Sequence, residues 1–396
     1  MNPVYVVAAV RTPIGKFRGA LAGVRADHLG AHALNELIAR AGVEAGQIDD
    51  VIFGNVTQIG EQSANIARTS LLGAGWPVTI PAMTVDRKCG SSEAAIHIGA
   101  AQIAAGLSDL VVAGGAEAMS RVPMGSNRAI HGEAFGSMVS DRYELTSQGE
   151  AAERIADKYG FDRDALDDFA AESHRRAAAA TDAGYFRAET VSVPVGDLAE
   201  KDWEGPRDTL DADQTIRRDT SREKLSTLKT SFRENGRVTA GNASQISDGA
   251  AVVLLASEAA VKKYGLTPLA LIRSVAVVGA DPVMMLEGPV AASQKAAASA
   301  GLSFDDIALF EVNEAFASVP LMWMQQTGVG ADRLNVNGGA IALGHPLGAT
   351  GARLATSLIH ELGRTGQKYG LQAICCAGGL ATATVYENLM PKPASA

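Results

Sequence analysis

Three cysteines in 396 residues make each thiol worth considering as a nucleophile. Cys89 lies directly before a glycine, two serines and an apolar helical stretch. At a helix N-terminus, the macrodipole and the free backbone N–H groups lower the pKa of a thiol and stabilise its thiolate. Because Gly90 has no side chain, a substrate can approach the backbone, where the Cys89 N–H can donate to an oxyanion. A buried, inert cysteine at a strand end is the alternative.

His345 is a candidate for the base that such a thiol needs. It lies in residues 335–351, which hold five glycines and one proline. A rigid loop of this kind holds an imidazole in a fixed place, where it can take the proton of a thiol. A histidine hydrogen-bonded within its own loop is the alternative. The other histidines have no comparable surroundings, and we expect surface or helix positions for them: His28, His32, His97, His131, His174 and His360.

The remaining thiols, Cys375 and Cys376, are adjacent in the sequence. The pair therefore lacks the two-residue spacer of zinc-binding and thioredoxin motifs. So few cysteines also argue against a disulfide framework and against a cysteine-rich metal site. We expect no metal centre.

Composition narrows the class of protein. Hydrophobic residues make up 47% and charged residues 20% of the chain, enough to build a large core. The net charge of −9 argues against whole-chain attraction to nucleic acid or to an anionic membrane surface. No run of about 18 apolar residues predicts a membrane span. The N-terminus has no basic stretch and indicates an opening strand rather than a signal peptide, so we expect a cytoplasmic protein.

Short apolar runs alternate with alanine-rich helical stretches, which predicts α/β layers with helices on both faces of the sheets. The expected strands are residues 4–10, 51–56, 109–113, 252–255, 269–278, 307–312 and 371–376. The expected helices are residues 27–41, with Asp27 as N-cap, 91–105, 163–183, 290–300 and 348–362.

An internal repeat is visible at a constant offset. Residues 48–51 resemble residues 304–307, and 305 minus 49 gives an offset of 256. The same offset carries Cys89 onto His345, and each precedes a small-residue turn and a helix. Two similar halves place these helix starts at related positions, facing one pocket.

A more polar stretch separates the two halves. Insertions of this length usually build a binding site or a lid. We therefore expect three units: residues 1–118, 119–249 and 250–396.

The segments around Cys89 and His345, residues 313–316 and the late cysteines together resemble the thiolase family, in the family's order and over nearly the whole chain. The resemblance implies the thiolase fold: two βαβαβαββ halves in five layers, with a loop domain inserted after the first. It also implies an acyltransferase of β-oxidation that reversibly cleaves 3-ketoacyl-CoA to acetyl-CoA and a shortened acyl-CoA, through an acyl group on Cys89.

The resemblance assigns the family's second catalytic thiol to Cys375. Counted from Cys375, small residues occupy all three small-residue positions of the family pattern, whereas counting from Cys376 puts Leu380 at one of them. Cys376 is then expected to be a small core residue.

The resemblance also implies two oxyanion holes. One consists of His345 and a water held by Asn313, and the other of the N–H groups of Cys89 and Ala377. Ala377 stands where the family commonly has glycine, but its N–H group is still available.

Coenzyme A is expected as a substrate, not as a permanently bound cofactor. Residues 217–233 hold six basic residues against two acidic ones, which suits the CoA phosphates, although a charge run is usually a solvated face. By the resemblance, Arg217 contacts CoA, Ser244 binds the pantetheine arm, and Phe232 and Phe316 wall its tunnel.

One segment departs from the family. Residues 147–149 are Ser-Gln-Gly where short-chain members carry His-Met-Gly, so we expect a different acyl pocket. Residues 245–248 and 311–319 look nearer to bacterial degradative thiolases, including those of steroid side chains.

Three alternatives stay open: a biosynthetic acetoacetyl-CoA-forming acetyltransferase, a decarboxylating ketoacyl synthase and a non-catalytic lipid or CoA carrier. A homodimer or homotetramer is expected from the resemblance.

Overall fold

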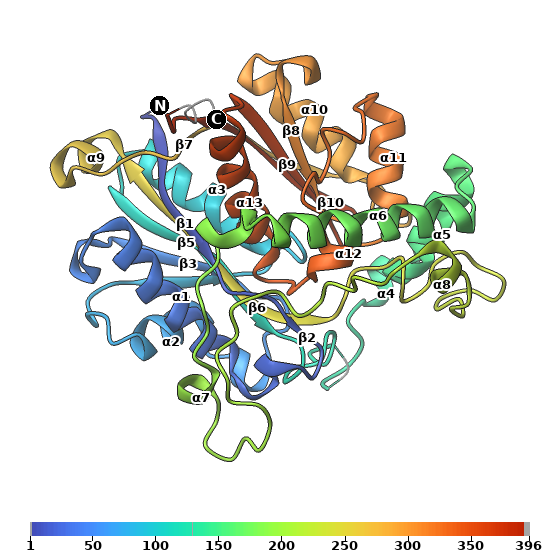
Figure 1. The fold of residues 1–396 in the computed structure, drawn as a ribbon, viewed down its shortest axis with the longest axis horizontal. Helices are drawn as coiled ribbons and strands as arrows, with labels where there is room; N and C mark the ends of the chain where they lie inside the picture. Colours follow the sequence, from blue (N-terminus) through green and yellow to red (C-terminus); the bar gives the residue numbers. More distant parts are fainter. Residues whose placement is uncertain (1, 129, 392–396) are drawn as a thin grey trace.

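A mixed β-sheet runs through the molecule, and helices cover its faces (Figure 1). The computed structural model describes residues 2–128 and 130–391. Its strands are β1 (Val4–Arg11), β2 (Gly15–Lys16), β3 (Asp50–Gly54), β4 (Ala82–Val85), β5 (Leu110–Ala118), β6 (Ser247–Ser257), β7 (Ala270–Gly279), β8 (Leu309–Val312), β9 (Tyr369–Cys376) and β10 (Leu380–Asn388).

The helices fall into those of the two halves and those in the stretch between β5 and β6. The former are α1 (Ala26–Ala41), α2 (Ile66–Gly73), α3 (Ser91–Ala104), α9 (Glu258–Tyr264), α10 (Gly288–Ala300), α11 (Ser318–Thr327), α12 (Ala340–Leu343) and α13 (Thr350–Thr365). The latter are α4 (Ser137–Ser140), α5 (Gln148–Tyr159), α6 (Arg163–Asp182), α7 (Val195–Leu198) and α8 (Arg222–Ser226).

Each expected strand and helix has a counterpart in the structure, but several elements were not predicted. β4 is half-exposed at the sheet edge, and β10 alternates alanine and threonine, so neither presents the continuous apolar run that predicts a buried strand. The expected strands at 109–113 and 252–255 are parts of β5 and β6, which continue through small residues.

The sheet contains two halves with the same strand order. In the first half, β4, β3, β5, β6 and β1 lie side by side, which is the order 3-2-4-5-1 along the chain. In the second half, β8, β9, β10 and β7 follow as 2-4-5-1, and a bridge between Phe310 and Leu334 takes the place of the third strand. β1 pairs with β7 and joins the halves. The predicted duplication is therefore confirmed.

The predicted offset of 256 was wrong by three residues. The 3-10 turns before β3 and β8 begin at Ala45 and Phe304, and α3 and α13 begin at Ser91 and Thr350. Both 304 minus 45 and 350 minus 91 give 259. The true equivalent of Cys89 is therefore Gly348, and His345 precedes it by three positions. The shifted match aligned Asp49 and Asp50, which follow the 3-10 turn before β3, with Asp305 and Asp306, which lie inside the 3-10 turn before β8.

The helices complete five layers. α1 and α2 pack on the outer face of the first half-sheet, and α10 packs on the outer face of the second, with α11 behind it. α3 and α13, which occupy equivalent places in the two halves, pack against each other between the two half-sheets. Figure 1 shows α3 and α13 at the centre of the molecule. This middle layer positions the segments that precede its helices, which carry Cys89 and His345.

The stretch between β5 and β6 lies across one side of the sheet, with α6 as its longest helix (Figure 1). β6 follows this stretch but lies between β5 and β1, so it completes the first half. The expected boundary between residues 249 and 250 thus falls inside a strand.

The expected cap of the first helix was also wrong. Arg25 occupies the N-cap position of α1, and Asp27 lies within the first turn. Arg25 donates to both carboxylate oxygens of Asp27, over 2.9 and 3.0 Å, so this carboxylate binds a guanidinium instead of capping the helix.

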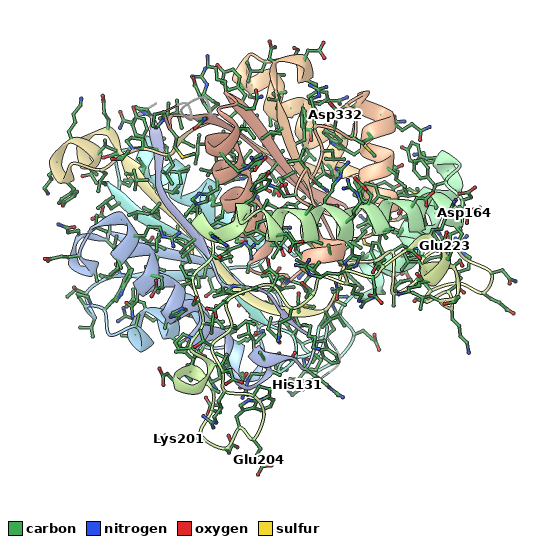
Figure 2. All side chains as sticks on the ribbon, viewed as in Figure 1. His131, Asp164, Lys201, Glu204, Glu223 and Asp332 are labelled. Atoms are coloured by element: carbon green, nitrogen blue, oxygen red, sulfur yellow. The ribbon has the colours of Figure 1, made fainter. Side chains whose placement is uncertain are left out.

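The polar periphery surrounds this core. His131 is exposed, and Figure 2 shows it at the edge of the molecule. Lys201 and Glu204 lie at the tip of a projecting loop in the same view. Within residues 2–128 and 130–391, no helix has the length and apolar character needed to cross a membrane.

Gly54→Ala is expected to destabilise the fold. A Cβ at Gly54 would lie 2.4 Å from the Ser92 nitrogen and 2.7 Å from the Gly348 oxygen, so backbone of the middle layer would have to move. We expect a loss of roughly 2–3 kcal/mol in unfolding free energy, measured by urea denaturation at fixed protein concentration. Gly46→Ala is the control, because a Cβ there meets no described atom within 4 Å. Equal stability of the two variants would contradict the packing argument.

Candidate active site

Cys89 lies in a tight turn between β4 and α3. Lys88 has a positive φ of 51°, and its N–H donates to Asp86 over 2.7 Å. Ser91 accepts from the Arg87 N–H over 2.9 Å and donates to the Lys88 carbonyl over 2.6 Å. These local bonds fix the turn and hold the thiol at the entry to α3. The Cys89 side chain is buried, yet it lines a cavity.

His345 lies in the connection between α12 and α13. Its N–H donates to the Ser247 hydroxyl over 2.8 Å and to the Gln245 carbonyl over 3.1 Å. The ring Nδ1 lies 2.6 Å from Thr350 Oγ1, and Nε2 lies 3.4 Å from the Asn313 amide nitrogen. Backbone and ring are therefore both anchored, as the glycine-rich pattern predicts.

Asn313 follows β8 and is fully buried. Its side-chain oxygen has no hydrogen-bond partner among the described residues and is free to hold a further donor. Two neighbours keep the chain in place there. Asn335, at a positive φ of 45°, bonds both the N–H and the carbonyl of Val312, and it donates to Glu314 over 2.9 Å. Glu314 in turn accepts from Ile341 N–H and ties this segment to the His345 loop.

Cys375 and Cys376 project to opposite faces of β9. Cys375 packs with Phe316 and Leu286, which both line the cavity. Cys376 packs beneath the turn that carries Cys89, where a Cβ at Gly90 would lie 2.8 Å from its sulfur. The charge of a Cys89 thiolate is among the causes that raise the pKa of each thiol, so both lie within electrostatic reach of Cys89.

The cavity has a volume of about 710 Å³. Cys89 and His345 line it, and so do all four residues expected to bind CoA: Arg217, Phe232, Ser244 and Phe316. Phe232 and Phe316 meet edge to face with ring centroids 5.8 Å apart. The structure thus gathers six residues from distant parts of the sequence around one space.

Most of the basic stretch is neutralised by acidic neighbours. Four of its six cations form ion pairs with Asp or Glu side chains: Arg218, Arg222, Lys224 and Arg233. Arg217 forms no ion pair with any residue that the structure describes, and it lines the cavity. The expected positive island is therefore reduced mainly to Arg217 at the cavity.

Comparison with known proteins identifies the family. The sequence model of the "Thiolase, N-terminal domain" matches residues 4–259, and that of the "Thiolase, C-terminal domain" matches residues 266–388. The chain belongs to the thiolase family.

Similar proteins and solved structures agree with the assignment to the thiolase family. The chain is 45% identical to the steroid 3-ketoacyl-CoA thiolase FadA6 of Mycobacterium tuberculosis, over 98% of this chain and 95% of that protein. It is 43% identical to a 3-ketoacyl-CoA thiolase of Bacillus subtilis, over 98% of this chain and 100% of that protein. The crystal structure of the Bacillus anthracis acetyl-CoA acetyltransferase superposes with a TM-score of 0.89 at 39% identity, covering 98% and 99% of the two chains.

Several cavity residues of this thiolase were not found by sequence reasoning, because no local pattern marks them. They are Lys16, Phe17, Met119, Met124, Gln214, Leu286 and Leu347, among others. The departure at residues 147–149 does carry a signal. Gln148 lines the cavity, and a Cβ at Gly149 would fall 2.1 Å from the Phe232 ring, so this glycine makes room for the ring.

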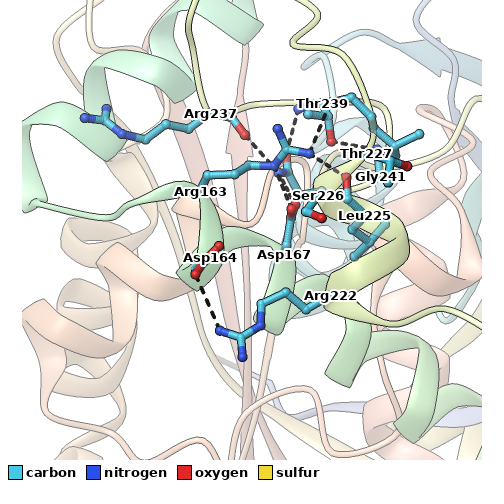
Figure 3. A network of polar contacts seen from close by, with 12 residues as sticks. Arg163, Asp164, Asp167, Arg222, Leu225, Ser226, Thr227, Arg237, Thr239 and Gly241 are labelled. Carbon is cyan, nitrogen blue, oxygen red and sulfur yellow. Dashed lines mark hydrogen bonds and ion pairs between the residues drawn. The ribbon is translucent and has the colours of Figure 1, made fainter.

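The wall that carries Ser244 is held by α6. Asp167 accepts from Arg163 over 2.6 Å (Figure 3). It also accepts from the Asn242 amide over 2.8 Å. The Asn242 oxygen accepts from Thr239 N–H over 2.9 Å, which closes the turn before Ser244. A buried carboxylate on α6 thus shapes one side of the thiolase cavity.

The electrostatics of Cys89 differ from the sequence expectation. Burial raises the pKa of Cys89 to about 11, although the N–H groups of Ala377 and of Cys89 itself act in the lowering direction. Burial, with a contribution from Arg353, lowers the pKa of His345 to about 3. The expected lowering by the helix N-terminus is outweighed, because a charged thiolate is costly without solvent. The resting pair is a neutral thiol and a neutral imidazole.

His345→Asn is expected to slow alkylation of Cys89 by iodoacetamide at pH 7 by at least about tenfold, because the thiolate is the reactive form and its base is lost. Since the pKa of Cys89 is raised to about 11, the difference should shrink as the pH approaches that value. Peptide mapping of the labelled protein measures the rate. His360→Asn is the control. His360 lies on α13, its ring bonds the Ala9 carbonyl of β1, and neither residue lines the cavity. A ratio that does not change with pH would contradict the argument.

Proposed function

We propose that this chain catalyses the CoA-dependent, reversible thiolytic cleavage of 3-ketoacyl-CoA to acetyl-CoA and a shortened acyl-CoA. The observation that carries the proposal is that Cys89 and His345 line one cavity together with the predicted CoA-binding residues. A nucleophile, its base and a site for the thioester are what acyl transfer through a covalent intermediate requires.

In the first step, His345 Nε2 takes the Cys89 proton as the sulfur attacks the 3-keto carbon. The bond between C2 and C3 then breaks, leaving the acyl group on Cys89 and an acetyl-CoA enolate, which Cys375 protonates. In the second step, Cys375 takes the proton of an incoming CoA thiol, whose sulfur attacks the acyl group and releases acyl-CoA and the Cys89 thiolate. The thiolate takes its proton back from His345, which restores the resting pair. The condensation is the reverse of these steps.

Two sites stabilise negative charge in this mechanism. The free oxygen of Asn313 can hold a water beside His345, opposite the enolate oxygen. The N–H groups of Ala377 and Cys89, which approach the Cys89 sulfur, can donate to the tetrahedral oxyanion. Both sites use groups that are fixed before the substrate binds.

The CoA moiety is placed by the other cavity residues. We propose that Ser244 and the edge-to-face pair of Phe232 and Phe316 hold the pantetheine arm, and that Arg217 meets a phosphate. We also propose a cytoplasmic homodimer or homotetramer, whose subunit number light scattering will determine. A first thiolase half that ends after β6 fits the strand order better than one that ends before it.

The range of substrates separates the degradative thiolase from the biosynthetic acetyltransferase. A degradative thiolase turns over long-chain or steroid 3-ketoacyl-CoA, whereas a biosynthetic acetyltransferase is restricted to acetoacetyl-CoA and its formation. The relatives with both kinds of name have similar identity to this chain, so a profile across the three substrates decides. Gln148 and the methionines in the cavity favour an acyl pocket unlike that of the short-chain pattern.

Cys375→Ser is expected to separate acyl transfer onto Cys89 from carbon–carbon bond cleavage. The variant should still take an acyl group from acyl-CoA onto Cys89, seen by mass spectrometry, but its rate of carbon–carbon cleavage should fall about 10²–10⁴-fold, since the general acid is lost. Cys376→Ser is the matched control on the other face of β9 and should retain cleavage. Retained cleavage in Cys375→Ser would favour a ketoacyl synthase mechanism. No acyl adduct from any acyl-CoA in the wild-type protein would favour a carrier.

A further inference from the structure

Thr350 contacts the catalytic imidazole on the side away from Asn313. It is the first residue of α13, five positions after His345, and it is fully buried. Its Oγ1 lies 2.6 Å from His345 Nδ1 and 2.9 Å from the Pro346 carbonyl oxygen. Both distances are within hydrogen-bond range, so one hydroxyl connects the ring to the backbone of its own loop.

These two contacts determine where the protons lie. A carbonyl oxygen can only accept, so the Thr350 hydroxyl donates its single proton to Pro346. Its oxygen is then left as an acceptor toward the ring, and His345 Nδ1 must donate. In a neutral imidazole one nitrogen carries the proton and the other carries a lone pair. The hydrogen-bond pattern therefore leaves the lone pair on Nε2.

The opposite side of the ring agrees with this assignment. The group nearest Nε2 is the Asn313 amide nitrogen, at 3.4 Å, which can donate but cannot accept. An Nε2–H tautomer would place two donors against each other on this side. On the other side, the lone pair would lie on Nδ1, and the Thr350 hydroxyl could bond it only by giving up its hydrogen bond to the Pro346 carbonyl.

We propose that Thr350 is a positioning residue, whose hydroxyl fixes His345 as the Nδ1–H tautomer so that Nε2 is ready to accept the Cys89 proton. The role rests on the proposed thiolase reaction, but the tautomer itself does not. Many acyl-transfer sites orient their histidine with a carboxylate, which also stabilises the imidazolium. Here the orienting group is a neutral hydroxyl.

The neutral partner has a chemical consequence. Without a carboxylate at Nδ1, the imidazolium formed by proton uptake is not stabilised, in agreement with the lowered pKa of His345. The Arg353 guanidinium contributes to the lowering from the same helix. A proton taken onto Nε2 is therefore held weakly and is readily donated to a developing oxyanion. Thr350 thus supports both the base and the hydrogen-bond donor roles proposed for His345.

Nuclear magnetic resonance of ¹⁵N-histidine-labelled protein tests the tautomer directly. The sequence holds seven histidines, and the His345 signals are those absent from the His345→Gln variant. Between pH 6 and 8 we expect a protonated Nδ1 and an unprotonated Nε2 in the wild-type protein. An Nε2–H tautomer or an imidazolium in this range would overturn the proposal. This measurement needs neither substrate nor turnover, so it is independent of the proposed function.

Kinetics of three variants test the role. Thr350→Val is expected to lower kcat for thiolysis by at least about tenfold, as for partial loss of a general base, with KM changed less than about threefold. Thr350→Ser keeps the hydroxyl and should restore kcat to within about threefold of the wild type, as expected if the hydroxyl and not the methyl group acts.

Thr356→Val is the matched control. Thr356 is buried on the same helix, and its hydroxyl donates to the Ala352 carbonyl over 2.8 Å, one turn back. This variant should keep the wild-type kcat. Equal losses in Thr350→Val and Thr356→Val, or no rescue by Thr350→Ser, would reduce Thr350 to a structural role and overturn the proposal. If the wild-type protein turns over no 3-ketoacyl-CoA while the Nδ1–H tautomer is observed, the proposed function fails and the tautomer assignment stands.

Discussion

The site depends on a close approach of backbones between the two halves of the fold. A Cβ at Gly115 would lie 2.1 Å from the Gly348 oxygen, and one at Gly351 would lie 2.3 Å from the Glu93 nitrogen. Glycine at these places lets the entries of α3 and α13 contact each other and the strand ends beneath them. Glu117 strengthens the joint, because its buried carboxylate accepts from the Gly348 N–H over 2.9 Å and from two N–H groups of the first half. Cys89 and His345 precede these helices, so this contact sets their distance.

Much of the architecture was predictable because burial leaves a clear trace in the sequence. Strands that are covered on both faces, such as β6, are continuous apolar runs, and the duplication of the halves appears as a repeat. What failed depends on competition that a local pattern does not contain. Asp27 has the right residue type for a cap, yet Arg25 binds it. The repeat register was misplaced by three residues, because a three-residue slip kept acidic residues aligned. Edge strand β4 and the small-residue strand β10 carry too little hydrophobic pattern to be found.

The reactive residues of the candidate site were predictable from the sequence, but the residues that support them were not. A histidine among glycines and a cysteine before a helix signal their chemistry locally, and the structure brings both to one cavity. Residues that hold them in place give no such signal. Asp167 and Glu117 lie in an ordinary helix and strand, and their contacts at the site are with partners more than 20 positions away in the chain. The sign of the Cys89 pKa shift was also beyond a local argument, since it depends on how much protein covers the thiol.

The neutrality of the resting pair suggests how such a site separates binding from chemistry. Burial raises the pKa of Cys89 and lowers that of His345, so moving the proton between them creates two poorly solvated charges. In the proposed mechanism, that transfer becomes favourable when the sulfur bonds to the keto carbon and the negative charge moves to an oxygen that faces fixed N–H donors. The protein therefore stabilises charge where the transition state has it and not where the free enzyme would have it, which is the condition for lowering a barrier instead of tightening the ground state. Burial of the thiol, which weakens it as a free nucleophile, thereby contributes to selectivity for a substrate that brings its own oxyanion.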